Sequence, residues 1–227
     1  MTPTFLEELL LLLSADEKSL VLRPDLTPWL DTATAGALLM DLALRNHIDS
    51  DPRQLVVVDT RPTGEPLLDG ALDVLGGHPP AGAIDTYVAA LARHGERFRA
   101  AAVDRLCARG ILKRQRGRRF WVFSTHAYPL VDGGAAAAVR ARTVAILFGD
   151  EIPDPRDVVL ISLVSACDLL PALLSPDECV RVRERVALLR RMDLIGQRVG
   201  RAIGDIRSVG QAIRHIEGTL ALSRAGI

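Results

Sequence analysis

Residues Val103–Phe123 read VDRLCARGILKRQRGRRFWVF, a stretch that joins the end of a helix to a dense group of cations. Six of the eleven residues from Arg109 to Arg119 are cationic and none is acidic. The whole chain nevertheless has a formal net charge of +0. Since overall charge cannot attract an anion here, this local concentration predicts one anion-facing surface, suited to membrane headgroups or to nucleic-acid phosphates.

The same stretch also has a predictable shape. We expect a helix Phe98–Arg109 closed by Gly110, because glycine readily takes the left-handed conformation that follows a helix. A short strand, a turn near 116–117 and a returning strand Phe120–Phe123 would then form a protruding basic β-hairpin. The unit resembles the last helix and wing of a winged-helix domain, although the preceding helix lacks the polar, basic face that would read bases.

The rest of the chain predicts a mainly α-helical single compact domain over residues 1–227. Thr4 and Glu7 form a capping-box pattern, and the five leucines Leu9–Leu13 that follow predict a central helix buried on all sides. Further helices are expected over roughly 32–45, 67–75, 85–93, 134–148, 158–170 and from 175 onward. Short strands are expected at 19–22 and 55–59, a loop with Pro24, Pro28 and Trp29 before the second helix, and one or two helices in 196–227.

The sequence contains no local motif for catalysis, metal or cofactor binding. The five histidines are scattered, and no H-E-x-x-H, G-x-S-x-G or phosphate-cradling glycine loop occurs. Carboxylates lie on amphipathic helices, where solvated positions are expected. The chain is therefore predicted to be a binding protein rather than an enzyme.

Cysteine usage and hydropathy predict an intracellular, water-soluble chain. Three widely separated cysteines without a C-x-x-C are typical of a reducing cytoplasm. Glu7 and Glu8 replace the basic start of a secretory signal. The longest apolar stretch, Val158–Leu174, contains Asp168 and Pro171, which favours a buried helix over a transmembrane segment.

Five segments resemble a bacterial member of the Golgi phosphoprotein 3 family, in that family's order and at its approximate spacing. They are TFLEELLLLL (Thr4–Leu13), LLMDLALRNHI (Leu38–Ile48), PTGEPLLDGAL (Pro62–Leu72), VDRLCARGIL with its hairpin (Val103–Phe123) and YPL (Tyr128–Leu130). The resemblance implies a helical domain with a protruding β-hairpin. It also implies a peripheral membrane protein that binds phosphatidylinositol 4-phosphate and helps to retain glycosyltransferases.

The family's headgroup pocket is only partly matched. It uses a Trp before the second long helix, an Arg at the start of that helix, and two Arg residues three apart before the hairpin. Here Arg99 takes the second paired position, Glu96 stands at the first with Arg97 beside it, and Ala35 replaces the helix-start arginine. Trp29 lies in the corresponding loop, displaced by about three residues. Fewer cations should weaken phosphoinositide binding, because charge-assisted hydrogen bonds carry such sites.

The leading hypothesis is a cytoplasmic, peripherally membrane-associated protein that binds anionic phospholipids. Its headgroup site would comprise Arg99, Trp29 and Arg97. Its membrane contact would comprise the hairpin residues Lys113, Arg114, Arg116, Arg118, Arg119, Phe120 and Trp121. The aromatic residues would lie at the interface, where an amphipathic indole is favoured.

Two alternatives stay open. A winged-helix nucleic-acid binder would place the same hairpin on phosphates, but the net charge of +0 and the missing recognition helix disfavour it. An adaptor would dock the hairpin on a partner's acidic tail or on a second copy of itself. This role is compatible with membrane binding.

Overall fold

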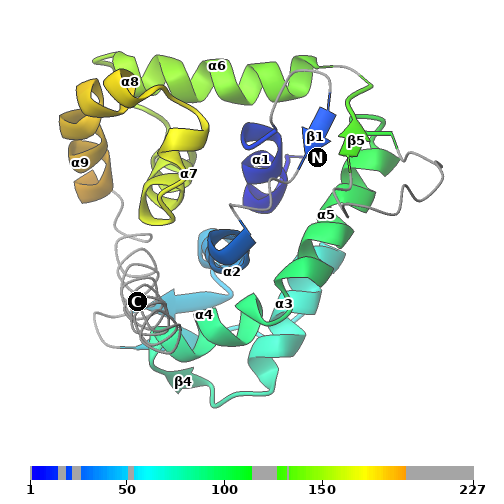
Figure 1. The fold of residues 1–227 in the computed structure, drawn as a ribbon. Coiled ribbons are helices and arrows are strands. Elements are labelled where there is room, and N and C mark those ends of the chain that lie inside the picture. The colour runs from blue at the N-terminus through cyan, green and yellow to red at the C-terminus, as the bar shows by residue number, and fades with distance from the viewer. Residues whose placement is uncertain are drawn as a thin grey trace, which may run out of the picture.

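The structure is a computed structural model, and it describes residues 2–14, 19–21, 27–50, 54–113, 127–131 and 133–192. The first helix, α1 (Phe5–Leu12), lies inside the molecule, beneath α6 and beside α2 in Figure 1. Every residue of α1 is buried, as the run of leucines predicted. Thr4 and Glu7 form the predicted capping box, in which the Thr4 hydroxyl accepts from the Glu7 amide.

The helices predicted within the described residues are present, with boundaries shifted by a few residues. They are α2 (Thr27–Leu44), α3 (Pro66–Gly76), α4 (Ile84–Ala92), α5 (Gly95–Ala108), α6 (Gly134–Phe148), α7 (Pro155–Ala166), the short 3-10 helix η2 (Leu170–Ala172), α8 (Pro176–Arg181) and α9 (Arg183–Met192). The fold is therefore mainly α, as expected from the sequence.

The start of α2 corrects one prediction. We expected Pro28 and Trp29 in a loop before a helix at residue 32, but α2 begins at Thr27 and includes both residues. Proline fits the first turn of a helix because its fixed φ is helical and its missing N–H would have no intrahelical partner there. Trp29 is thus held on a helix, partly buried against the core.

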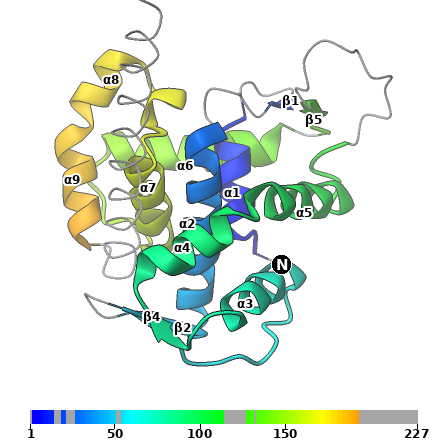
Figure 2. The same cartoon turned by 60° about the horizontal axis from the view of Figure 1, so that its bottom comes forward.

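Two small antiparallel sheets complete the described fold. In one, β1 (Ser19–Val21) pairs with β5 (Ala127–Pro129), with Leu20 opposite Tyr128. In the other, β3 (Leu55–Val57) lies between β2 (Ile48–Ser50) and β4 (Ala81–Gly82). β1 and β3 were predicted, whereas β2, β4 and β5 were missed. Figure 2 shows the two sheets at opposite ends of the helical body.

The core surrounds α2, which packs against α1, α4, α5 and α7. Figure 1 shows α2 at the centre, with α5 along one flank and α7 and α9 on the opposite flank. This arrangement places the first turns of α2 beside the start of α5. It also places the end of α5 beside the β1–β5 sheet, where the basic segment begins.

Candidate anion-binding site

The described residues at both ends of segment 114–126 are held together as an antiparallel ladder. Leu112 forms a bridge with Leu130. The amide of Lys113 donates to the carbonyl of Pro129 at 2.8 Å, and the amide of Val131 donates to the carbonyl of Ile111 at 2.9 Å. The residues that flank segment 114–126 are therefore paired, and the strand opposite 111–113 is 129–131, which lies beyond the returning strand predicted at Phe120–Phe123.

The helix that leads into this ladder ends as expected. α5 stops at Ala108, and Gly110 has a φ of +72°, in the left-handed region that favours glycine. Of the predicted membrane-contact residues, Lys113 lies within the ladder. The others, Arg114, Arg116, Arg118, Arg119, Phe120 and Trp121, lie outside the described residues, as do the predicted returning strand and the tail 196–227.

Arg99, the main predicted headgroup ligand, is buried and already paired. Its Nη1 donates to Oδ1 of Asp31 at 2.6 Å and to Oγ1 of Thr34 at 3.3 Å. The Arg99 side chain is 9% exposed, whereas that of Asp31 is 40% exposed. The guanidinium charge therefore faces a carboxylate of the same chain, which sequence reasoning missed because Asp31 was expected in or next to a loop.

Gly95 makes room for this ion pair at the first turn of α5. A Cβ added at Gly95 would lie 2.3 Å from Oδ1 of Asp31 and 2.9 Å from Nη1 of Arg99. Both separations are far shorter than carbon–oxygen or carbon–nitrogen contact distances. The carboxylate thus lies directly against the backbone at the start of a helix, where the helix dipole favours negative charge.

The other predicted pocket positions lie on the same two helices, α2 and α5, in different surroundings. Trp29 lies two residues before Asp31 on α2, partly buried against the core. Arg97 is exposed, and its guanidinium lies 5.0 Å from the ring centroid of Phe98. Glu96 is exposed, and Ala35, which follows Thr34, is fully buried. The structure therefore brings the start of α2 to Arg99, with Asp31 rather than a further cation beside it.

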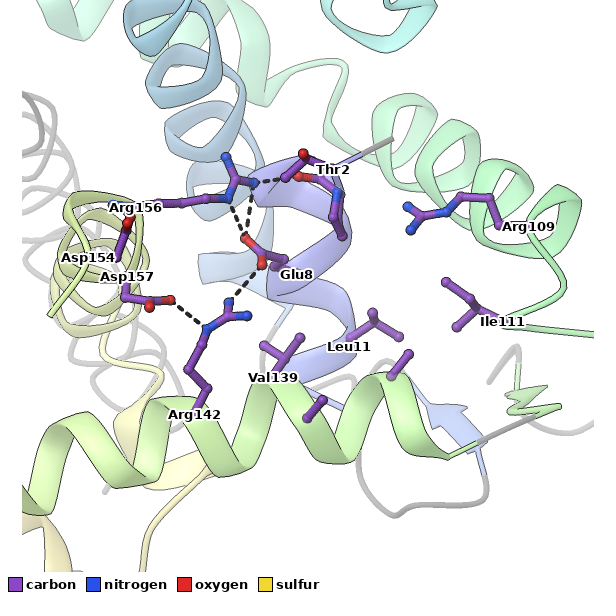
Figure 3. Close-up of a pocket in the computed structure, with 13 residues that line it drawn as sticks. Thr2, Glu8, Leu11, Arg109, Ile111, Val139, Arg142, Asp154, Arg156 and Asp157 are labelled. Carbon is purple, nitrogen blue, oxygen red and sulfur yellow. Dashed lines mark hydrogen bonds and ion pairs between the residues drawn. The ribbon is translucent and has the colours of Figure 1, made fainter.

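A separate cavity of about 440 Å³ lies between α1, the end of α5, α6 and α7 (Figure 3). Glu8, which is almost fully buried, projects into it between two arginines. Its Oε1 accepts from Arg142 at 2.7 Å, and its Oε2 accepts from Arg156 at 3.1 Å. Arg142 also pairs with Asp157 at 2.7 Å. The rest of the lining is largely apolar and includes Leu11 and Val139.

Neighbouring acids complete this charged cluster around α1. Glu7, which is fully buried, accepts from Nε of Arg105 at 3.3 Å and from Nη1 of Arg109 at 3.5 Å. Arg105 also pairs with the buried Glu65. Each cavity arginine thus faces a carboxylate, so this cavity has little net charge to offer a ligand. The network connects α1 to α5, α6 and α7 and serves packing.

The burial of these acids corrects a second prediction. Carboxylates were expected on solvated helix faces, but Glu7, Glu8, Asp41 and Glu65 are all buried. The burial of Glu7 and Glu8 could have been predicted from the sequence, because both lie in a leucine-rich helix that was expected to be buried on all sides. Buried charge requires a partner, and arginines from three other helices supply it.

Asp41 is the buried acid with the clearest shift in pKa. Its Oδ2 accepts from the backbone amide of Phe5 at 2.7 Å, at the start of α1. Desolvation raises the pKa of the Asp41 carboxyl from 3.8 to about 6, against the opposing effects of the Phe5 hydrogen bond and of Arg156. The residue that accepts from the first amide of α1 is thus itself a titratable group with a raised pKa.

The described part of the chain contains no group of three or more histidine, cysteine and acidic side chains placed to hold a metal ion. Within the same residues, no helix combines the length and apolar character needed to cross a membrane. None of the three cysteines, which all lie in the described residues, forms a disulfide.

The fold and site together define a mainly helical protein that holds a basic segment between the end of α5 and β5. The family model for Golgi phosphoprotein 3 (GPP34) matches residues 6–206, and the chain belongs to this family. The resemblance seen in the sequence is thereby confirmed. Among curated proteins, none matches the chain.

Proposed function

We propose that this protein is a peripheral membrane protein that binds anionic phospholipids, and that it acts as a binding protein or adaptor rather than as an enzyme. One observation carries the proposal. The two ends of segment 114–126 are clamped side by side by the Lys113–Pro129 and Val131–Ile111 hydrogen bonds, and the segment between them is rich in arginine. Membership of the Golgi phosphoprotein 3 family supports the same function.

The expected strength of this contact follows from its charge. A basic residue near an anionic leaflet contributes about 1 kcal/mol, so the five cations from Lys113 to Arg119 contribute about 5 kcal/mol. This alone corresponds to binding weaker than about micromolar. Stable docking therefore needs a further contribution from Phe120 and Trp121, from a headgroup site, or from several copies bound together.

The finer proposal is that a phosphorylated headgroup of the phosphatidylinositol 4-phosphate type binds beside Arg99. Arg97 is exposed on the same turn of α5, and Trp29 lies near the start of α2, whose next turns contact Arg99. Because Asp31 already neutralises Arg99, this site is expected to be weaker than one with free paired arginines.

Vesicle cosedimentation tests the proposed function. The protein is expected to sediment with vesicles that contain phosphatidylserine and to stay in solution with pure phosphatidylcholine. Binding should weaken as salt is added, because exposed charges are screened. Equal sedimentation with both kinds of vesicle would contradict the proposal. A salt-sensitive shift of duplex DNA without vesicle binding would assign the basic segment to nucleic acid instead.

A further inference from the structure

We propose that the carboxylate of Asp31 is a built-in competitor for a phosphate monoester at Arg99. On this view, a phosphate binds only when Asp31 turns out toward solvent. The inference rests on the proposed function for its lipid ligand, but the competition itself concerns any phosphate monoester, whether carried by a lipid headgroup or free in solution.

The two partners differ in how firmly they are held. Arg99 is 9% exposed and is also fixed by the hydroxyl oxygen of Thr34, whose own proton is donated to the carbonyl of Leu30 at 2.7 Å. The Asp31 side chain is 40% exposed. The cation is therefore fixed in the protein, whereas its carboxylate partner can leave for water at little cost in desolvation.

The Arg99 guanidinium also has N–H donors that Asp31 and Thr34 do not use. Within the described residues, both hydrogen bonds of Arg99 leave from the same nitrogen, Nη1. A guanidinium carries five N–H donors in a planar fork, which matches the oxygens of a phosphate better than those of a single monodentate carboxylate contact. A phosphate in place of Asp31 can thus gain hydrogen bonds that Asp31 does not make.

Gly95 supplies the space. The site of its absent Cβ lies 2.3 Å from Oδ1 of Asp31, so any other residue would collide with an oxygen at this place. Glycine lowers the helix propensity of the first turn of α5, a helix of 14 residues. Because glycine has no side chain, an anion can lie against the backbone at the positive end of this helix. The fixed cation, the helix start and the missing side chain together form a place for an anion, which Asp31 occupies.

The first experimental arm uses inorganic phosphate and thermal unfolding. Asp31→Asn keeps an oxygen for Arg99 but removes the competing charge, so phosphate should raise the unfolding temperature of this variant clearly more than that of the wild type. Chloride at the same ionic strength should not do so. Asp150→Asn, the same charge change in the exposed loop between α6 and α7, is the matched control and should behave like the wild type.

The second arm uses phosphatidylcholine vesicles with and without phosphatidylinositol 4-phosphate. Asp31→Asn should bind the phosphoinositide vesicles about tenfold more tightly than the wild type, the size of one charge-assisted hydrogen bond. The double variant Asp31→Asn, Arg99→Lys should lose this gain, because an ammonium lacks the fork while keeping the charge. Circular dichroism confirms that each variant is folded before binding is compared.

The outcomes separate this inference from the proposed function. A gain in both arms supports competition with a lipid headgroup. A gain with inorganic phosphate alone supports a site for free phosphate and contradicts the headgroup as its source. If Asp31→Asn matches the wild type in both arms, the inference is wrong. Binding of phosphatidylserine vesicles through the basic segment would stand in that case, because it does not involve Asp31.

Discussion

Asp41 illustrates how a single buried residue sets a property of the protein. Its carboxylate caps α1 through the Phe5 amide and lies 3.6 Å from Arg156, yet desolvation raises its pKa to about 6. The Asp41 carboxyl therefore binds a proton more tightly in the native state than in the unfolded chain. The stabilisation that results is complete below about pH 4 and is lost as the pH rises through about 6.

Asp41→Asn should remove this pH dependence, because an amide keeps an oxygen for the Phe5 amide without a titrating group. A shift from 3.8 to about 6 corresponds to about 3 kcal/mol. The free energy of unfolding of the variant, relative to the wild type, should rise by about this amount between pH 4 and pH 7. Urea denaturation at several pH values measures it, and a constant difference between the two proteins would refute the assigned pKa.

The roles of residues that interact within one helical turn were predictable from the sequence. The roles of residues whose partners lie far along the chain were not. Gly110 and the Thr4–Glu7 capping box follow from rules within one turn of a helix. Asp31 and Glu8 do not, because their arginine partners lie on helices far along the chain. Arg99 was identified through the family resemblance, whereas its pairing with Asp31 required the structure.

In the part of the chain that the structure describes, helices α1 and α8 both begin with a capping box, one buried and one exposed. Thr4 caps α1 and is fully buried, while Ser175 caps α8 and is exposed. In both, the hydroxyl accepts from an amide three residues on, and a glutamate reaches back to the capping amide. The buried pair has no water to replace a lost hydrogen bond, so the same substitution should have unequal effects.

Thr4→Ala is expected to lower the free energy of unfolding by about 2 kcal/mol, and Ser175→Ala by about 0.5 kcal/mol, the upper and lower ends of the range for helix caps. Each substitution removes the capping hydroxyl, but Thr4→Ala also removes a buried methyl group. Thr4→Val, which keeps the bulk and lacks the hydroxyl, is therefore its control. Urea denaturation of both variants supplies the comparison. An equal or larger loss for Ser175→Ala would show that burial does not determine the strength of these caps.

Helices were easier to predict than strands for a physical reason. A helix closes its hydrogen bonds within itself, so periodicity and caps reveal it locally. The strands here have three residues or fewer, and β1 pairs with β5 from a distant part of the chain. Such short segments carry little pattern of their own, which explains why β2, β4 and β5 were missed.

For the molecule as a whole, the charged cluster around α1 holds separate helices together. Glu8 forms ion pairs with Arg142 of α6 and Arg156 of α7, while Glu7 forms one with Arg105 of α5. Figure 3 shows Glu8 between its two arginines, with Asp157 on the far side of Arg142. Loss of the central carboxylate would leave two partly buried cations facing an uncharged group.

Glu8→Gln should therefore destabilise the protein by about 3 kcal/mol, as expected for breaking a buried pair. Asp59→Asn is the control. It removes an equally short ion pair, 2.7 Å from Arg61, but the arginine there is 86% exposed, and the loss should be much smaller. Urea denaturation measures both. If the two variants lose similar stability, the cluster around α1 is not what holds α6 and α7 in place.

The central claim is that the basic segment carries membrane binding, and one comparison tests it most directly. Charge reversal to Glu at Arg116, Arg118 and Arg119 is measured by cosedimentation with phosphatidylserine vesicles. Charge reversal at the exposed Arg181, Arg183 and Arg190 of α8 and α9, on the opposite flank from β5 in Figure 1, is the control. We predict that the first variant loses binding and the second retains it. Equal binding by the two variants would contradict the account.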